Sequence, residues 1–220
     1  MSKMLTTQLL KLALCLTGVF LNITFNRICF FAGFPLYLDT VMTITVTLAC
    51  GLPFGILCGA LTNIISHSIF GHGWEAYLFA ICNIATAFLT WFFYRFFKQE
   101  LTIQEQTPSV RQKSSQLNRI MDRVIILIFL SFTLCLAMSI LGGLIAAFIL
   151  NINSAYFETD GITGVFSATM FVHDVPIVLK EIIARIPVNM IDRLISVFAG
   201  YGIAFFGNKL WELLKKIRKN

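Results

Sequence analysis

Long apolar stretches without charged residues alternate with shorter polar ones along most of this chain. A helix that crosses the hydrocarbon core of a bilayer needs about 20 predominantly apolar residues. On this basis the pattern predicts an all-α integral membrane protein with six transmembrane helices in a single membrane domain, residues 1–220. The predicted spans cover residues 9–31, 38–52, 54–71, 75–96, 123–150 and 188–210.

The segments between the spans differ in character. Residues 51–53 (GLP) are a turn signal, so the second and third spans are predicted to form a helical hairpin. The polar residues 97–122 are predicted to be a cytoplasmic linker that is too short for a domain. Residues 151–187 are predicted to form an outer loop that could hold a re-entrant or interfacial helix. A seventh span is the alternative there, but it would bury Asp174 and contain Pro176, and both are unfavourable.

The composition narrows the class of protein. Hydrophobic residues make up 57% of the chain and charged residues 13%, whereas about 25% of the residues in soluble domains are charged. These values exclude disordered, coiled-coil, collagen-like and disulfide-scaffold proteins. The six cysteines lie mostly in apolar runs without metal-ligand spacing, which predicts buried thiols.

The distribution of basic residues predicts the orientation. The chain has 17 Lys and Arg against 11 Asp and Glu, a net charge of +6. If both termini are cytoplasmic, all the basic residues but four lie on the cytoplasmic side, as is typical of membrane proteins. The four exceptions are Arg27, Lys180, Arg185 and Arg193. The positive charge therefore indicates topology and not a nucleic-acid partner.

Small and polar residues recur at intervals of four in the third and sixth spans, and residues four apart share a helix face. In the third span they are Gly51, Gly55, Gly59, Asn63, His67 and Gly71. In the sixth span they are Asp192, Ser196, Gly200, Ala204 and Asn208. Small residues in this pattern predict close helix packing at Gly51, Gly55, Gly59 and Gly200. The polar members of both stripes lie in the predicted outer halves of the spans.

Polar side chains from several spans are therefore predicted to meet in an outward-opening pocket, because unpaired polar groups in hydrocarbon are costly. The candidate solute-binding residues are Asp39, Asn63, His67, Asn83, Asn189 and Asp192, with Arg193 available for a carboxylate or phosphate. The alternative is a polar network that only holds the helices together. A metal site formed by His67, His72, Glu75, His173 and Asp174 is a weaker alternative, since these residues include no tight ligand pair.

Catalytic motifs give no sign of an enzyme. The sequence has no G-x-S-x-G, H-E-x-x-H, Walker or Rossmann pattern. We therefore expect no catalytic residues, no metal and no cofactor.

The runs FPLYLDT (residues 34–40) and GLPFGILCGALTN (residues 51–63) resemble the substrate-binding S component of energy-coupling factor (ECF) transporters. The later run IPVNMIDR (residues 186–193), followed by VFAGY (residues 197–201), is similar to the last helix of some S components. The resemblance implies a multi-pass protein of the bacterial cytoplasmic membrane that captures a vitamin-like micronutrient from outside.

The resemblance also implies partners. S components assemble with a membrane T component and two ATPase subunits, and often contact the T component through an A-x-x-x-A face of the first helix. The nearest match here is Ala13 with Thr17, which departs from that pattern. Similar membrane modules head some sensor kinases, so a membrane sensory or scaffold subunit is the alternative function.

Overall fold

The computed structural model describes residues 3–70, 73–101, 113–152 and 176–217, and within these ranges it contains helices and no β-strand. The all-α class predicted from the sequence is therefore confirmed for the described part of the chain. The elements are α1 (Lys3–Phe31), α2 (Val41–Cys50), α3 (Leu52–Phe70), the 3₁₀-helix η1 (Trp74–Phe79), α4 (Ala80–Phe96), α5 (Lys98–Leu101), α6 (Lys113–Ile152) and α8 (Ile177–Ile217).

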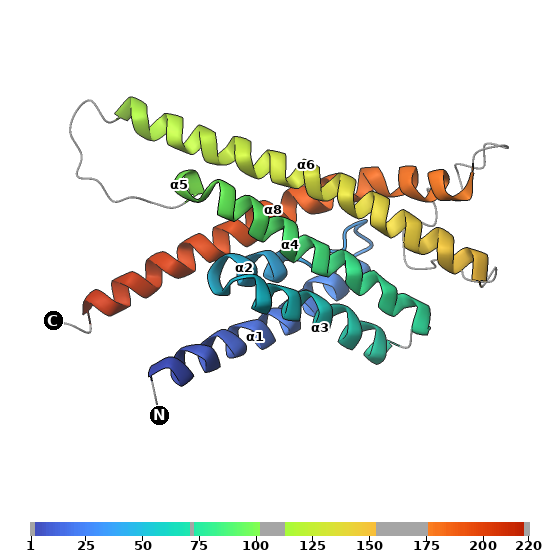
Figure 1. Cartoon of the computed structure of the whole chain (residues 1–220), viewed down its shortest axis with the longest axis horizontal. Helices are drawn as coiled ribbons and strands as arrows, with labels where there is room; N and C mark the ends of the chain where they lie inside the picture. The colour runs from blue at the N-terminus through green and yellow to red at the C-terminus, as the bar shows by residue number, and fades with distance from the viewer. Residues whose placement is uncertain (1–2, 71–72, 102–112, 153–175, 218–220) are drawn as a thin grey trace.

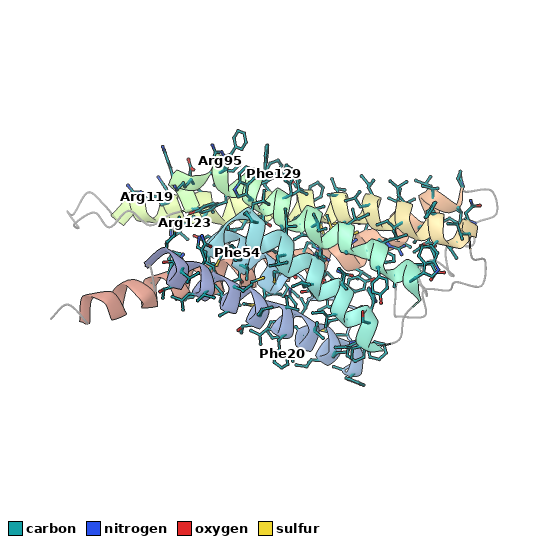
Figure 2. The ribbon with its side chains drawn as sticks, turned by 60° about the horizontal axis from the view of Figure 1, so that its bottom comes forward. Phe20, Phe54, Arg95, Arg119, Arg123 and Phe129 are labelled. Carbon is teal, nitrogen blue, oxygen red and sulfur yellow. The ribbon has the colours of Figure 1, made fainter. Side chains whose placement is uncertain are left out.

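Four helical segments among the described residues are long and apolar enough to cross a membrane. They are Met4–Phe31, Leu52–Phe70, Trp74–Phe96 and Asn118–Ile152. Large apolar side chains also lie on the outer surface of the bundle, where Phe20 is 69% exposed and Phe129 is 55% exposed (Figure 2). Long apolar helices with an apolar outer surface indicate a multi-pass membrane protein.

These four segments correspond to the first, third, fourth and fifth predicted spans. The second predicted span corresponds to α2, a shorter apolar helix of 10 residues. The sixth lies within α8, which has 41 residues but is not among the described segments that are both long and apolar enough. The number of six spans and the orientation of the termini remain predictions, although α1 begins and α8 ends at the same end of the bundle (Figure 1).

Helix α2 lies at the centre of the bundle and packs against α1, α3, α4 and α8. Its residues from Val41 to Thr47 are all buried. Ten residues of α-helix are about 15 Å long, which is half the thickness of a hydrocarbon core. Because α2 is short and buried, its first turn lies inside the bundle, where the carbonyl of Val41 faces Gly200 in the middle of α8.

Two glycines end helices by adopting positive φ angles. Gly33 has φ +69° and follows α1. The N–H of Phe34 donates to the carbonyl of Cys29 at 3.0 Å, and that of Gly33 to Phe30 at 3.1 Å, which is the Schellman pattern. Gly51 has φ +94° and ends α2, so the turn signal of the sequence lies at the junction of α2 and α3.

Other glycines allow helices to approach closely. A Cβ atom at Gly59 would lie 2.8 Å from the carbonyl oxygen of Asn83 on α4, and one at Gly200 would lie 2.7 Å from that of Val41 on α2. A Cβ atom at Gly55 would collide with Thr47 on α2. At Gly51 no atom would lie within 4 Å of such a Cβ. This glycine is therefore needed for the positive φ angle of the turn and not for the close helix packing that was expected there.

The ends of two helices differ from the predicted boundaries. Helix α8 begins at Ile177, so the last part of the predicted outer loop 151–187 is helical. Pro187 lies inside α8 and has no N–H for the helix hydrogen bonds, and α8 changes direction between its orange first part and its red remainder (Figure 1). Helix α6 begins at Lys113, inside the predicted linker 97–122. Residues 102–112, residues 153–175 and Gly71 lie outside the described residues.

The short helix α5 is attached to one end of the bundle by two side chains. The Nε atom of Arg123 on α6 donates to the carbonyl oxygen of Glu100 at 2.8 Å. The hydroxyl of Tyr201 on α8 donates to that of Leu101 at 2.9 Å. The basic residues Arg95, Arg119 and Arg123 gather at this end (Figure 2).

Candidate functional site

Charged and polar side chains meet where the connection between α1 and α2 lies against the middle of α8, and all of them except Asp39 are buried. We call this group the Asp39 cluster, and it comprises Asp39, Thr40, Asn83, Asp192 and Arg193. Asp192 is completely buried and Arg193 is 4% exposed. Such residues are rarely buried without a partner in any protein, and ionisable groups inside a membrane are rarer still.

Asp192 holds the backbone that leads into α2. Its Oδ1 atom accepts the N–H groups of Tyr37 at 2.9 Å and Leu38 at 2.8 Å. Leu38 has φ +46°, in the left-handed region that costs a non-glycine residue about 1–2 kcal/mol. This conformation lets two consecutive N–H groups point at one carboxylate oxygen, and the two charge-assisted hydrogen bonds offset its cost.

Arg193 joins the same connection to α8 through its guanidinium group. Its Nη1 atom donates to the hydroxyl of Thr40. Its Nη2 atom lies 3.2 Å from Oδ2 of Asp192 and 3.8 Å from Oδ1 of Asp39. The other oxygen of Asp39 accepts a hydrogen bond from the side-chain amide of Asn83 on α4, at 3.0 Å. The cluster therefore links three parts of the fold, namely residues 37–40, α4 and α8.

The charges of the cluster do not balance. It contains two carboxylates and one guanidinium, a formal charge of −1. Among the described residues, the ionisable neighbours of Arg193 are Asp192, Asp39, Cys82, Tyr37 and Cys135, and none of them is a basic residue. The Oδ1 atom of Asp39 and the Nε atom of Arg193 are buried without a hydrogen-bond partner, as is the hydroxyl of the neighbouring Ser196.

A second polar group is centred on Asn22 of α1. Its amide nitrogen donates to the hydroxyls of Thr43 at 3.1 Å and Thr62 at 3.2 Å, and its oxygen accepts the N–H of Met42 at 2.8 Å. Met42 is in the first turn of α2, where N–H groups have no partner within the helix. Asn22 therefore caps α2 from another helix, and every polar atom of its side chain is paired.

The structure brings four of the predicted site residues together, namely Asp39, Asn83, Asp192 and Arg193. The other three have partners elsewhere. Asn189 donates to the hydroxyl of Ser139 on α6 at 3.0 Å. The Oδ1 atom of Asn63 lies 3.1 Å from Nε2 of His67, whose ring meets that of Tyr77 edge-on at 6.3 Å.

Some polar residues of the interior were not among the predicted site residues. Thr40 and Ser196 are both completely buried beside the predicted residues, and the sequence signal was their position, next to Asp39 and four residues after Asp192. Glu181 and Arg185 form a buried ion pair within α8. Their spacing of four residues is that of a helical pair, but this stretch was predicted to be a loop.

Ala13 and Thr17, the residues of α1 that were predicted to form a packing or partner face, are both exposed at the surface of the described bundle. Within the described residues, no three His, Cys, Asp or Glu side chains gather in a way that could hold a metal ion. His72, His173 and Asp174 lie outside those residues.

Comparison with known proteins gives no relative for this chain: no family model, no curated protein and no solved structure matches it.

Proposed function

We propose that this chain is the substrate-binding subunit of an ECF-type uptake transporter and captures a small, polar, vitamin-like nutrient from outside the cell. The observation that carries the proposal is the Asp39 cluster, in which the charged residues Asp192 and Arg193 are buried in a protein with several apolar helices. Ionisable residues inside a membrane protein are expensive, and they commonly mark the route or the binding site of a solute.

The contrast between the two polar groups of the interior supports a binding role. The Asn22 group is fully paired, as expected of polar residues that only hold helices together. The Asp39 cluster keeps buried atoms of Asp39 and Arg193 without hydrogen bonds, together with an unbalanced charge. A polar network that only stabilises the fold is most stable when all its polar atoms form hydrogen bonds within the protein. A binding site, in contrast, needs polar atoms that are left to pair with a ligand.

Within the cluster we assign ligand contact to Asp39 and Asn83. The side chain of Asp39 is 20% exposed, whereas that of Arg193 is 5% exposed and that of Asp192 is fully buried. Arg193 already pairs with two carboxylates and Thr40, so its role in this proposal is to hold Asp39 in place. Asn63, His67 and Asn189 are the further candidates for the surroundings of the nutrient.

The partners in this proposal are a membrane T component and two ATPase subunits. The exposed positions of Ala13 and Thr17 on α1 support a docking face for the T component. Six spans, cytoplasmic termini and the bacterial cytoplasmic membrane complete the proposal. The four apolar helices support the membrane location.

The experiment is a thermal-shift screen of the protein purified in mild detergent, with single vitamins added. A true nutrient should raise the melting temperature, and mass spectrometry of the purified protein should detect the same molecule bound. Asn83→Ala should weaken binding, and the matched control Asn118→Ala, at an exposed position of α6, should not. If no nutrient stabilises the wild type, the proposal is wrong.

Co-purification distinguishes transport from sensing. Recovery of ATPase subunits with the tagged chain supports the transporter, and replacing Ala13 and Thr17 by tryptophan should reduce that recovery. Recovery of a histidine kinase or a cyclase in their place would favour the sensory subunit.

A further inference from the structure

We propose that the carboxylate of Asp39 binds a monovalent cation, which is either an ammonium group of the transported solute or an inorganic ion such as Na⁺. This inference rests on the proposed function, because it assigns the charge of what occupies the same site.

The first step is the charge of the cluster. Among the described residues, the other ionisable side chains that interact electrostatically with Asp192 or Arg193 are Asp39, Tyr37, Cys29, Cys82 and Cys135, and none of them is basic. One guanidinium thus faces two carboxylates. The N-terminus of α2, next to Asp39, contributes only about half an elementary charge. A negative charge is therefore left over, and a buried charge of this kind strongly favours a bound positive charge.

The second step is that this excess resides on Asp39. Asp192 is compensated by two backbone N–H groups and by Arg193 at 3.2 Å. Asp39 has one amide hydrogen bond, from Asn83, and its nearest guanidinium nitrogen is 3.8 Å away, beyond hydrogen-bond distance. Its Oδ1 atom is buried and accepts no hydrogen bond. Asp39 is also the only one of the three charged residues in the cluster whose side chain is as much as 20% exposed.

The third step is that α8 contributes further oxygen atoms with unused hydrogen-bonding capacity in the turn that carries Arg193 and in the turn after it. The Oδ2 atom of Asp192 is buried and accepts no hydrogen bond, although it is paired with Arg193. Ser196 follows one turn later on the same face of α8, and its hydroxyl is buried without a hydrogen-bond partner. Oxygen atoms of carboxylates and hydroxyls are the groups that bind ammonium and alkali cations. The buried Nε atom of Arg193 is a donor without a hydrogen-bond partner, but it belongs to the guanidinium that already lies between the two carboxylates. The carboxylate oxygens without hydrogen bonds therefore match a ligand that carries positive charge.

The test measures the melting temperature of the purified full chain in two arms at constant ionic strength. In the inorganic arm, NaCl replaces tetraethylammonium chloride, whose cation has no N–H group and is too bulky to approach a carboxylate oxygen closely. The organic arm compares pyridoxamine with pyridoxine, which differ by an aminomethyl in place of a hydroxymethyl group. We expect a rise of about 5–10 °C in at least one arm at 100 times the dissociation constant, and no comparable rise with pyridoxine.

Asp39→Asn keeps the shape of the side chain and removes its charge, so it should abolish the rise. The matched control Asp122→Asn removes an exposed carboxylate from α6 and should leave the rise unchanged. Should Asp39→Asn fail to fold, the wild type still provides a readout. Labelling of Asp39 by dicyclohexylcarbodiimide, an apolar reagent for carboxyl groups, should decrease as NaCl replaces the bulky salt, while labelling of Asp122 should not.

Two results overturn the cation site: a wild type that no cation stabilises, and an Asp39→Asn variant that is stabilised as much as the wild type. The cation site and the proposed function can fail separately. If a neutral or anionic vitamin binds equally well to the wild type and to Asp39→Asn, the cation site is refuted and the transport proposal stands. If Na⁺ stabilises through Asp39 and no nutrient does, the cation site stands and the transport proposal fails.

Discussion

Replacing Arg193 by methionine tests the interpretation of the buried charges most directly. Methionine is unbranched and apolar and reaches about as far as the Nε atom of arginine, so the change removes the guanidinium and its charge but keeps the packing of the side-chain stem. The substitution leaves Asp39 and Asp192 facing each other without a counter-charge, and it removes the donor to the hydroxyl of Thr40.

The expected cost follows from the burial of the partners. Removing one member of a buried ion pair typically costs about 3–5 kcal/mol, because the other charge remains buried and uncompensated. Asp192 is completely buried, so this range applies to it. For a chain of this size, 1 kcal/mol corresponds to a shift of about 2–4 °C in melting temperature. Arg193→Met should therefore lower the melting temperature by about 6–20 °C.

The six free cysteines provide the assay. Cys15, Cys58 and Cys135 are buried and lie on different helices. A maleimide dye that becomes fluorescent on reaction with thiols therefore reports unfolding in detergent as these side chains become exposed. Melting curves of the wild type and of each variant can be compared at one detergent concentration and one pH.

Two further variants make the result interpretable. Arg119→Met removes an exposed arginine from α6, and it should change stability by no more than about 0.5 kcal/mol. Adding Asp192→Asn to Arg193→Met removes one of the two uncompensated charges and should restore part of the lost stability. If Arg193→Met melts within about 2 °C of the wild type, the buried cluster does not carry the charges that we assign to it.

Three further predictions concern packing and hydrogen bonds. Gly59→Ala should destabilise the protein by about 1–3 kcal/mol in the same thermal assay, because the new Cβ would meet the Asn83 carbonyl at 2.8 Å; Gly202→Ala, which meets no atom within 4 Å, should stay within about 1 kcal/mol of the wild type. Asn22→Leu should cost about 1–3 kcal/mol, since it leaves the buried N–H of Met42 unpaired, and unchanged melting would contradict the capping role. Tyr201→Phe removes the hydroxyl that donates to the Leu101 carbonyl, and it should lower the stability by about 1 kcal/mol and speed the exchange of the amide hydrogens of α5. Equal exchange rates in the variant and the wild type would show that other contacts hold α5.

The apolar pattern predicted those helices whose position depends only on the length and composition of the local sequence. The four apolar helices that could cross a membrane lie where uncharged runs were found, because the apolar content and length of a run depend only on sequence. The end of α2 was also predictable, since Gly51 adopts a positive φ angle that favours glycine. The length of α8 was not predictable, because Pro187 and the charged residues before it are typical of a loop. This stretch is helical in a segment that packs along α6, and such tertiary contacts can outweigh local propensity.

The site was predictable only in part, because its geometry depends on contacts across the fold. The sequence was enough to predict that the polar residues Asp39, Asn83 and Asp192 lie in the outer halves of the predicted spans. The use of backbone N–H groups from residues 37 and 38 could not, since it requires a left-handed Leu38 that no propensity would predict. Arg193 pairs with two acids, so in our proposal its role changes from a binder of anions to a group that positions Asp39.

In our proposal, the position of the Asp39 cluster couples ligand binding to the bonds that hold the α1–α2 connection on α8. Residues 37–40 are held to α8 by backbone bonds to Asp192 and side-chain bonds to Arg193. In our proposal a cation at Asp39 competes with Arg193 for the same Oδ1 atom, which is already 3.8 Å from the guanidinium. Binding would then strengthen the hold of Arg193 on Asp192 and Thr40 rather than on Asp39. The same residues would thus contact the solute and change the bonds of the connection beside its site, as the proposed substrate-binding subunit would need in order to bind and then release a nutrient.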